Sequence, residues 1–506
     1  MINIIPKPYS IVDHNKLIKI DGFKYNCPKF LEAGLDLFKN EFPSGNYIIN
    51  VIYKKFNNEE AYSINVKDKK IDVEASSERS LFYATRSIYQ LIERKKNKLF
   101  LNSCYIFDKP KMKYRSFSLD EVRHFFGKEE VFKILDILSL LKINYFHWHL
   151  SDDQGFRINI KKYPNLALIG SRREKTQIIN DFGNCYDETI YQYYYEEEDI
   201  LEIIEYAKKR YISIVPEFDV PGHTGSLVAA YPHLHCFNKK LPVFVRACGN
   251  YDIICPSKKS TYEFLDGLFA EIMKLFKDSE YFHLGGDEVI PTNWKICPDC
   301  LRKMKELNTD NPHDLQGYFS NRFIDLLKKY NKKMIMWHDG IKSDTCDNII
   351  LQYWVWQMDK QGIDKINEGR PTIYSPCSQM YFDSAYAELP LKRTYDRGIV
   401  LKGLTKKGRG SIFGMECCSW NEFIRDTDFL EFMIMPRIHA FSESAWSFKK
   451  NLNYSDFKIR LKYHFKLLDE KNINYCKEHL FDNDHNEAVI SPIFRKYNRY
   501  IEYNQN

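Results

Sequence analysis

Two adjacent carboxylates, Asp287 and Glu288, follow a short apolar segment that ends in Gly285 and Gly286. Successive side chains of a strand point to opposite faces, so both acids reach one pocket only where the backbone leaves strand geometry, which the two glycines permit. Two acids in one pocket do not titrate alike: the less solvated one has the higher pKa and can act as a general acid, while the other stays ionised. Hydrolysis of a glycosidic bond requires this division of roles.

Eight short apolar segments, including this one, alternate with helical patterns from residue 114 onward. Helices are expected at 197–210, 260–276 and 313–330, where apolar residues recur every three or four positions. The helical pattern is weaker after the fifth and seventh segments. This alternation predicts an α/β fold, a (β/α)8 TIM barrel. Its strands are expected near residues 114–120, 143–149, 211–217, 280–285, 333–337, 349–354, 371–377 and 411–416.

Unusual polar and aromatic residues follow each of the eight predicted strands. Barrel enzymes build their active sites at the C-terminal ends of the strands, and ordinary core packing does not predict such clustering. Besides the acid pair, the candidate site residues at these ends are Arg123, Asp152, Asp219, His223, Trp337, Trp354, Trp356, Tyr381, Asp383, Trp420 and Glu422.

The chain before the barrel has a different pattern. An amphipathic helix is expected after Ser76 and Ser77, which can cap it, and strands are expected before it. We therefore predict a small non-catalytic α/β domain at 1–108, the catalytic barrel at 109–450, and a C-terminal helix and tail at 451–506. The strands of the small domain are expected at 46–53, 61–66 and 70–75.

Composition favours an uncharged partner. The net charge of +6 arises from 74 basic and 68 acidic residues spread along the chain, so neither a nucleic acid nor an anionic membrane surface is expected as a partner. Aromatic residues make up 15% of the chain, which suits the stacking of rings on sugars but suits an ordinary core equally well.

The first eight residues lack a basic region followed by a long apolar run, and no later segment approaches the ~18 apolar residues of a membrane span. The 13 cysteines are odd in number and scattered, which fits reduced thiols. We therefore predict a cytoplasmic protein.

One tight cysteine pair, Cys297 and Cys300, has the spacing of half a zinc site. A structural zinc needs two further ligands, and no second pair of this kind lies nearby in the sequence. We therefore predict a plain loop and no metal.

The motif His283-Leu284-Gly285-Gly286-Asp287-Glu288, followed by Trp294, resembles the catalytic signature of family 20 glycoside hydrolases, the β-N-acetylhexosaminidases. The motifs at the other strand ends resemble that family too, so the similarity extends from about residue 108 to about residue 446. The resemblance implies an exo-acting retaining enzyme without a cofactor, which removes terminal β-linked N-acetylglucosamine, and in some members N-acetylgalactosamine, from oligosaccharides. It also implies substrate-assisted catalysis through an oxazolinium intermediate.

The resemblance implies a role for each catalytic candidate. Glu288 is the general acid/base, Asp287 orients the acetamido nitrogen of the substrate, and Tyr381 holds the acetamido oxygen. His223, backed by Asp152, forms a relay toward Glu288.

The other candidates are implied to bind the sugar. Asp219 supports Asp287. Trp337, Trp420 and either Trp354 or Trp356 wall the acetamido pocket. The ligands implied for the sugar hydroxyls are Arg123, Asp383 and Glu422.

Some alternatives stay open. Asp153 could replace Asp152 in the relay, and relatives that release a disaccharide such as lacto-N-biose are not distinguished. Phe156 stands where the family commonly has tryptophan, and Trp337-His338-Asp339 replaces the frequent Trp-Asp-Glu. His147 and His149 face the same way on a strand, like the zinc pair of a barrel metallohydrolase, which is a less favoured alternative. A sugar-binding protein without catalysis would have no need of the acid pair.

Overall fold

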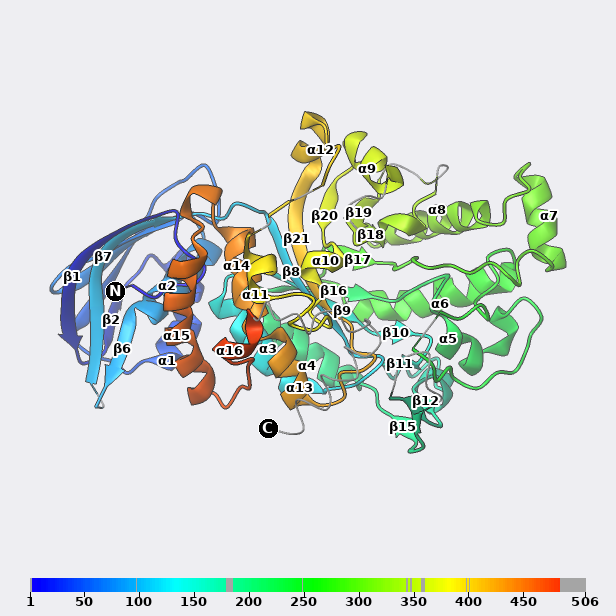
Figure 1. The fold of residues 1–506 in the computed structure, drawn as a ribbon, viewed down its shortest axis with the longest axis horizontal. Helices are drawn as coiled ribbons and strands as arrows, with labels where there is room; N and C mark the ends of the chain where they lie inside the picture. The colour runs from blue at the N-terminus through cyan, green and yellow to red at the C-terminus, as the bar shows by residue number, and fades with distance from the viewer. Residues whose placement is uncertain are drawn as a thin grey trace.

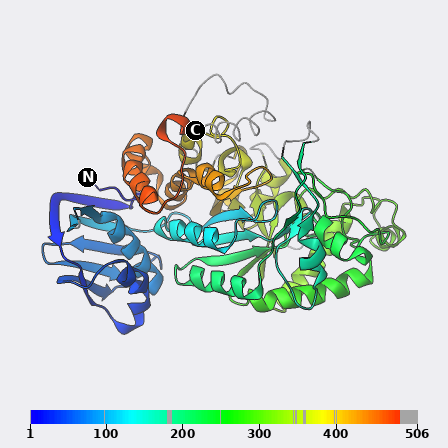
Figure 2. The same cartoon turned by 90° about the horizontal axis from the view of Figure 1, so that it is seen from below.

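The computed structural model describes residues 2–96, 98–178, 185–247, 249–342, 345, 348–355, 360–396, 398–399 and 401–482. A curved sheet domain lies at one end of an elongated molecule, and a barrel with its surrounding helices forms the rest (Figure 1). The C-terminal helices lie at the junction of the two parts in both ribbon views (Figure 2).

Eight parallel strands close into a barrel, which confirms the predicted fold. Its eight strands coincide with the eight apolar segments, and β21 closes the barrel by pairing with β8 from Gly414 with Tyr114 to Ser419 with Leu119. In chain order the strands are β8 (Tyr114–Asp120), β9 (Tyr145–His149), β16 (Ser213–Glu217), β17 (Tyr281–His283), β18 (Lys333–Trp337), β19 (Ile350–Tyr353), β20 (Thr372–Tyr374) and β21 (Ile412–Ser419).

Helices between the strands cover the barrel through apolar faces. In α4 (Glu197–Lys208), for example, Ile200, Ile203 and Ala207 are buried at helical spacing, and acidic residues occupy the first turn, where the helix dipole favours them. Other helices around the barrel include α3 (Lys128–Leu140), α6 (Lys259–Leu275), α8 (Asp314–Lys328), α13 (Thr427–Ile434) and α14 (Arg437–Trp446).

Helices are weakest where the sequence predicts them to be weak. After β18, the fifth strand, the described residues form only a short 3-10 helix at His338–Gly340, and α9 (Lys360–Asn367) follows β19. After β20, the seventh strand, three short helices replace one long helix: α10 (Cys377–Met380), α11 (Leu391–Asp396) and α12 (Lys406–Ser411).

The N-terminal domain is a seven-stranded sheet with the predicted helix packed against it. Helix α2 (Glu78–Leu91) begins after Ser77, whose side chain accepts a hydrogen bond from the Ser80 amide, so Ser77 rather than Ser76 is its cap. The three predicted strands are β3 (Tyr47–Tyr53), β4 (Tyr62–Val66) and β5 (Lys70–Ala75). The strands that the sequence analysis did not identify are β1 (Ser10–Ile20), β2 (Phe23–Asn26), β6 (Ile92–Lys95) and β7 (Lys98–Asp108).

Strand β1 was missed because it is an edge strand whose side chains are mostly exposed, so it lacks a strong apolar alternation. Its partner β7 lies inside the sheet, paired with both β1 and β4.

Buried ionic contacts fasten the sheet domain to the barrel. Lys142 Nζ lies 2.9 Å from Asp108 Oδ2, and both side chains are fully buried. The other Asp108 oxygen accepts a hydrogen bond from Trp446 Nε1 at 2.9 Å. Arg115, on the first barrel strand, pairs with Glu60 at 2.9 Å. Each contact joins a residue at or before position 108 to a residue after it. We retain the division of the chain at residues 108 and 450 as a proposal.

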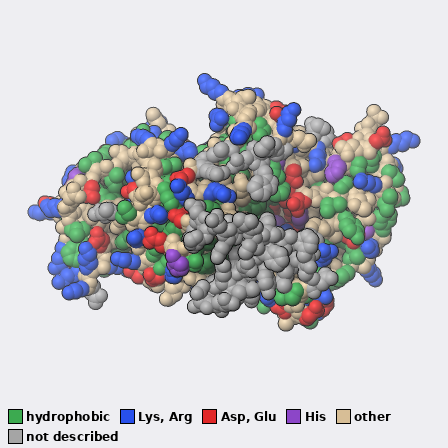
Figure 3. All heavy atoms as spheres, viewed as in Figure 1, with side chains coloured by type: hydrophobic (Ala, Val, Ile, Leu, Met, Phe, Trp, Pro, Cys, Tyr) green, Lys and Arg blue, Asp and Glu red, His purple; other side chains and the backbone are tan. Residues whose placement is uncertain are grey.

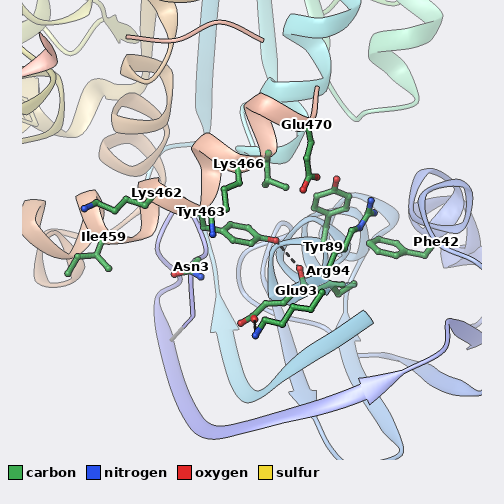
Figure 4. A pocket seen from close by; sticks show the side chains of 13 residues that line it. Asn3, Phe42, Tyr89, Glu93, Arg94, Ile459, Lys462, Tyr463, Lys466 and Glu470 are labelled. Atoms are coloured by element: carbon green, nitrogen blue, oxygen red, sulfur yellow. Dashed lines mark hydrogen bonds and ion pairs between the residues drawn. The ribbon is translucent and has the colours of Figure 1, made fainter. Parts of the chain in front are cut away.

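Helix α15 (Tyr454–Glu470) confirms the predicted helix after residue 450 and packs at the junction of the two parts. Arg460 on α15 binds Glu443 of α14 at 2.7 Å, and Tyr463 donates a hydrogen bond to the Ile92 carbonyl at 2.8 Å. A pocket of about 400 Å³ lies between α15 and the sheet domain (Figure 4). None of its lining residues is a candidate site residue.

No helix in the described part of the chain is long and apolar enough to span a membrane. Lysine and arginine side chains are scattered over the face drawn in Figure 3 rather than gathered in one patch, as the composition predicts.

Candidate active site

The backbone leaves strand geometry directly after β17, as the two glycines predict. Gly285 and Gly286 have φ angles of 69° and 85°, and Glu288 has a φ of 49°, which is uncommon for a residue with a side chain. A Cβ atom at Gly285 would lie 2.1 Å from the Asp219 carboxyl carbon, so only glycine fits there. The Asp219 carboxylate in turn accepts a hydrogen bond from the Gly286 amide at 2.8 Å.

The two adjacent acids lie in different environments. The Asp287 side chain is 16% exposed and that of Glu288 is 51% exposed. Burial, together with the charges of Asp339 and Glu288, raises the pKa of Asp287 to about 7, although His223 opposes the shift. The less solvated acid is therefore Asp287, so solvation alone would select it as the general acid, the reverse of the assignment implied by the resemblance.

A third carboxyl group lies beside Asp287. Burial and the neighbouring Asp287 raise the pKa of Asp219 well above its ordinary value. Asp219 also forms a hydrogen bond to Asp287 that favours the ionised form of Asp287. The two carboxyl groups are therefore hydrogen-bonded to each other and titrate as a pair.

His223 lies between the acid pair and Asp152, as the predicted relay requires. Its Nδ1 is 3.1 Å from Asp152 Oδ1, and its Nε2 is 3.8 Å from Glu288 Oε2 and 4.0 Å from Asp287 Oδ2. Asp153, the alternative partner, is farther from Nδ1, at 3.7 Å, and accepts a hydrogen bond from the Gly225 amide. Geometry thus favours Asp152.

Charge at this relay follows from its neighbours. Burial opposes charging of His223, but Asp152, Asp287 and Asp219 outweigh it and raise its pKa well above the ordinary value. Burial likewise opposes ionisation of Asp152, but Arg123 and His223 hold its pKa well below the ordinary value. The relay is therefore an imidazolium held against a carboxylate.

Arg123 is largely occupied by protein partners. Its guanidinium contacts Asp152 at 2.7 Å and Asp120 at 3.1 Å, and its Nε donates to Gln154 at 2.9 Å. Two of its five N–H groups remain for a sugar hydroxyl. Glu422 lies close enough to Arg123 to raise its pKa further, against the opposing effect of burial.

The barrel interior holds a buried network of histidines and carboxylates. His147 lies 2.9 Å from Glu416 and 3.2 Å from Glu217, and His149 contacts Glu217 and, at 3.1 Å, Asp152. Burial opposes their charging, but the acids raise the pKa of His147 to about 10 and that of His149 to about 9.

Both imidazoles are therefore protonated near neutral pH. Each imidazolium therefore forms ion pairs with two buried carboxylates inside the barrel.

Four aromatic side chains form a cluster beside the acids: Trp337, Trp354, Tyr381 and Trp420. The rings of Trp354 and Tyr381 are nearly parallel, with centroids 6.3 Å apart, and Trp420 lies 6.1 Å from Tyr381. Trp337 is buried and donates its indole N–H to Glu217 at 3.0 Å. Trp356 lies outside the described residues, so Trp354 is the tryptophan of the sixth strand end that the structure places in this cluster.

Tyr381 keeps its phenolic proton. Burial raises its pKa well above the ordinary value, so the hydroxyl remains a hydrogen-bond donor. Asp383, two residues later, is partly buried.

Asp339 is a residue near the acid pair to which the sequence analysis gave no role. It accepts a hydrogen bond from the Glu288 amide at 3.0 Å and another from the Trp354 indole at 2.8 Å. It thus connects the backbone of the proposed acid to the aromatic cluster. Its position after a predicted barrel strand, in a tripeptide that departs from the family pattern, was the available signal.

The cysteine pair has neighbours that the sequence did not reveal. Cys236 and Cys255 lie beside Cys297 and Cys300, with all four sulfur atoms within 4.8 Å of one another. No second pair of this kind lies nearby in the sequence, but two further thiols reach the pair in the fold, because the segments after two different strands meet here.

Comparison with known proteins agrees with this geometry. Residues 112–449 match the family model described as glycosyl hydrolase family 20, catalytic domain, and residues 28–109 match the model for domain 2 of the same family.

Two relatives of known name are similar to this chain in sequence. A beta-hexosaminidase of Porphyromonas gingivalis is 29% identical over 94% of this chain, and one of Vibrio furnissii is 31% identical over 76%. The chain spans 64% and 65% of the lengths of these two relatives.

Two solved structures extend the comparison. A GH20 exo β-N-acetylglucosaminidase of Vibrio harveyi in complex with N-acetylglucosamine is 27% identical, with a TM-score of 0.83 and coverage of 94% of this chain and 78% of that one. The β-N-acetylhexosaminidase of Bacteroides fragilis is 28% identical, with a TM-score of 0.80 and coverage of 96% and 98%.

Proposed function

Because the chain belongs to glycosyl hydrolase family 20, we propose that it is an exo-acting retaining β-N-acetylhexosaminidase. The substrate is a glycoside with a terminal β-linked N-acetylglucosamine, and N-acetylgalactosamine is the second sugar to be tested. One observation carries the proposal. Asp287 Oδ1 is buried and has no hydrogen-bond partner among the described residues, so it is an acceptor placed to receive a donor from the substrate.

The acetamido group supplies that donor. Its N–H donates to Asp287, while the Tyr381 hydroxyl donates to its carbonyl oxygen. Held between these two residues, the oxygen attacks the anomeric carbon and the glycosidic C–O bond breaks, which leaves an oxazolinium ion. Asp287 offsets the positive charge that develops on nitrogen.

Glu288 transfers the protons. It gives its proton to the leaving glycosidic oxygen, and it then takes a proton from the water that attacks the anomeric carbon and reopens the oxazolinium ring. The half-exposed side chain allows this water to reach it. His223 lies 3.8 Å from Glu288 and is paired with Asp152. Its positive charge stabilises Glu288 in the steps in which Glu288 is a carboxylate.

Substrate binding determines which of the two acids is ionised. Asp287 has a pKa of about 7 without a ligand because it is buried beside other acids. A bound N–H donor that becomes cationic favours the carboxylate and lowers this pKa. Asp287 thus ionises in the complex, and Glu288 remains the acid.

The remaining candidates hold the sugar ring. Arg123, Asp383 and Glu422 bind its hydroxyl groups, and Trp354 and Trp420 line the acetamido pocket. Trp337 lies behind the pocket, where its indole N–H donates a hydrogen bond to Glu217. Asp219 positions Asp287.

A panel of aryl glycosides tests the proposal. We expect turnover of the β-N-acetylglucosaminide, almost none of the β-glucoside that lacks the acetamido group, and strong inhibition by a thiazoline mimic of the oxazolinium ion. Comparable turnover of the β-glucoside, or a covalent sugar adduct on Asp287 or Glu288 in mass spectra taken during turnover, would refute substrate assistance. Including an aryl lacto-N-bioside distinguishes release of a monosaccharide from release of a disaccharide.

A cytoplasmic location is part of the proposal. It is supported by the described cysteines, which are all free. Cell fractionation with an antibody against the protein tests it.

A further inference from the structure

Four cysteine thiols meet between the loops that follow β16 and β17: Cys236, Cys255, Cys297 and Cys300. We call them the four-cysteine cluster. All four are free and buried, among apolar side chains that include Trp294 and Met304. No role in the proposed hydrolysis uses them.

Two sulfur-to-sulfur distances within the cluster match tetrahedral metal coordination. Four sulfur atoms about 2.3 Å from a zinc ion lie about 3.8 Å from one another. Cys255 Sγ lies 3.9 Å from Cys297 Sγ and 3.6 Å from Cys300 Sγ. A disulfide would require about 2 Å, so neither of these pairs is bonded.

Local structure brings the four thiols together. An isolated bridge pairs His235 with Ile254, the residues directly before Cys236 and Cys255. Cys297 is the N-cap of α7 (Pro298–Glu306), and Cys300 lies in its first turn. This arrangement, a Cys-x-x-Cys at a helix start facing two cysteines from another segment, is typical of a structural zinc site.

The loop after β16 needs such a connection. Among the described residues of 235–258 there is no helix or strand beyond that single bridge. Irregular loops of this length are uncommon in compact domains unless something orders them. Polar contacts already link the two loops at this point, since the Trp294 indole donates to the Ile254 carbonyl at 3.0 Å.

We propose that the four-cysteine cluster binds one structural zinc ion, which ties the loop after β16 to the loop after β17. Four thiolates complete the tetrahedron and leave no position for water or substrate, so the ion has no catalytic role. The tied loops carry His223 and Glu288, so the ion would hold these two members of the proposed relay at a fixed separation. Helix α7 lies at the edge of the barrel farthest from the sheet domain (Figure 1).

Metal analysis of the purified full-length protein tests the proposal. We expect about one zinc ion per chain by plasma mass spectrometry after exhaustive dialysis. Cys236→Ser and Cys300→Ser should each lose most of the zinc and unfold at a lower temperature. The matched control is Cys104→Ser, which replaces a buried free thiol of the sheet domain and should keep the zinc.

A second measurement does not depend on variants that fold. Wild-type protein is stripped of metal with a chelator under reducing conditions and refilled with cobalt(II). Strong thiolate-to-cobalt charge-transfer absorption, with the visible bands of a tetrahedral ion, is expected for four sulfur ligands.

Three results with the wild-type protein would overturn the proposal. They are wild-type protein without stoichiometric zinc, iron in place of zinc, and a disulfide between any two of the four cysteines in peptide maps of protein alkylated before reduction. Retention of zinc by both cluster variants would also refute it. None of these results depends on hydrolase activity, so the zinc proposal and the proposed function can fail separately.

Discussion

The raised pKa of Asp287 predicts that Asp287→Asn stabilises the protein while it inactivates it. The shift from 3.8 to about 7 means that the folded state holds a proton that the unfolded state has released. This proton binding stabilises the fold fully below about pH 4, and the stabilisation is lost as pH rises through about 7. At about pH 8 the buried, ionised carboxylate therefore destabilises the folded state.

The magnitude follows from the size of the shift. About three pKa units correspond to about 4 kcal/mol. The side chain is 16% exposed, so solvent relieves part of this cost, and the introduced amide is itself a poorly partnered buried group that costs about 1–3 kcal/mol. A net gain of about 1–3 kcal/mol at about pH 8 remains. The shift extends from about pH 4 to about pH 7, and about two pH units of this range lie above about pH 5. The gain in the free energy of unfolding should therefore grow by about 2 kcal/mol between about pH 5 and about pH 8.

Urea denaturation followed by tryptophan fluorescence at these two pH values measures the difference. The same variant should lose about 10²–10³-fold in kcat, because the developing positive charge on the acetamido nitrogen loses its carboxylate. Glu288→Gln is the matched control. Its side chain is 51% exposed, so the substitution should lower activity without a comparable gain in stability. An Asp287→Asn variant that is less stable than wild type at about pH 8, or equally changed at both pH values, would refute the reasoning.

Three further predictions concern the loops and the sugar ligands. Gly285→Ala should lower the free energy of unfolding by at least about 1–2 kcal/mol, because the residue has a positive φ and its new Cβ meets Asp219; wild-type stability in thermal denaturation would contradict this. His223→Ala should lower kcat and shift the pH profile of kcat, since the charged partner of Glu288 is removed, and an unchanged profile would leave His223 with a structural role. Glu422→Ala should weaken inhibition by a monosaccharide analogue by roughly 1.5–3 kcal/mol, the range for a hydrogen bond to a charged group, whereas undiminished inhibition would place Glu422 outside the pocket.

The barrel could be predicted because its strands are local patterns. Each strand is a short apolar run followed by polar residues, and burial on both faces makes such runs visible without any knowledge of their neighbours. Strand β1 carries no such signal, since it is exposed at the edge of its sheet and is held there by pairing with β7, about 90 residues later.

The types and order of the catalytic candidates were likewise present in the sequence. The glycines before Asp287, the position of His223 after the third strand and that of Tyr381 after the seventh are all local features. The sequence could not show how strongly each group would be perturbed. The raised pKa of Asp287 arises from its burial and from Asp339, a residue of the next strand end, and such proximity exists only once the barrel has closed.

The four-cysteine cluster shows most clearly which features are local in the sequence and which depend on the tertiary structure. Cys297 and Cys300 form a recognisable half-site because their spacing is local, and a helix start holds them together. Cys236 and Cys255 belong to a loop with little regular structure, and their distance along the chain says nothing about where that loop lies. They meet the pair because parallel barrel strands bring their following loops to the same end of the barrel, so the sequence determined which thiols exist and the tertiary structure decided which of them are neighbours.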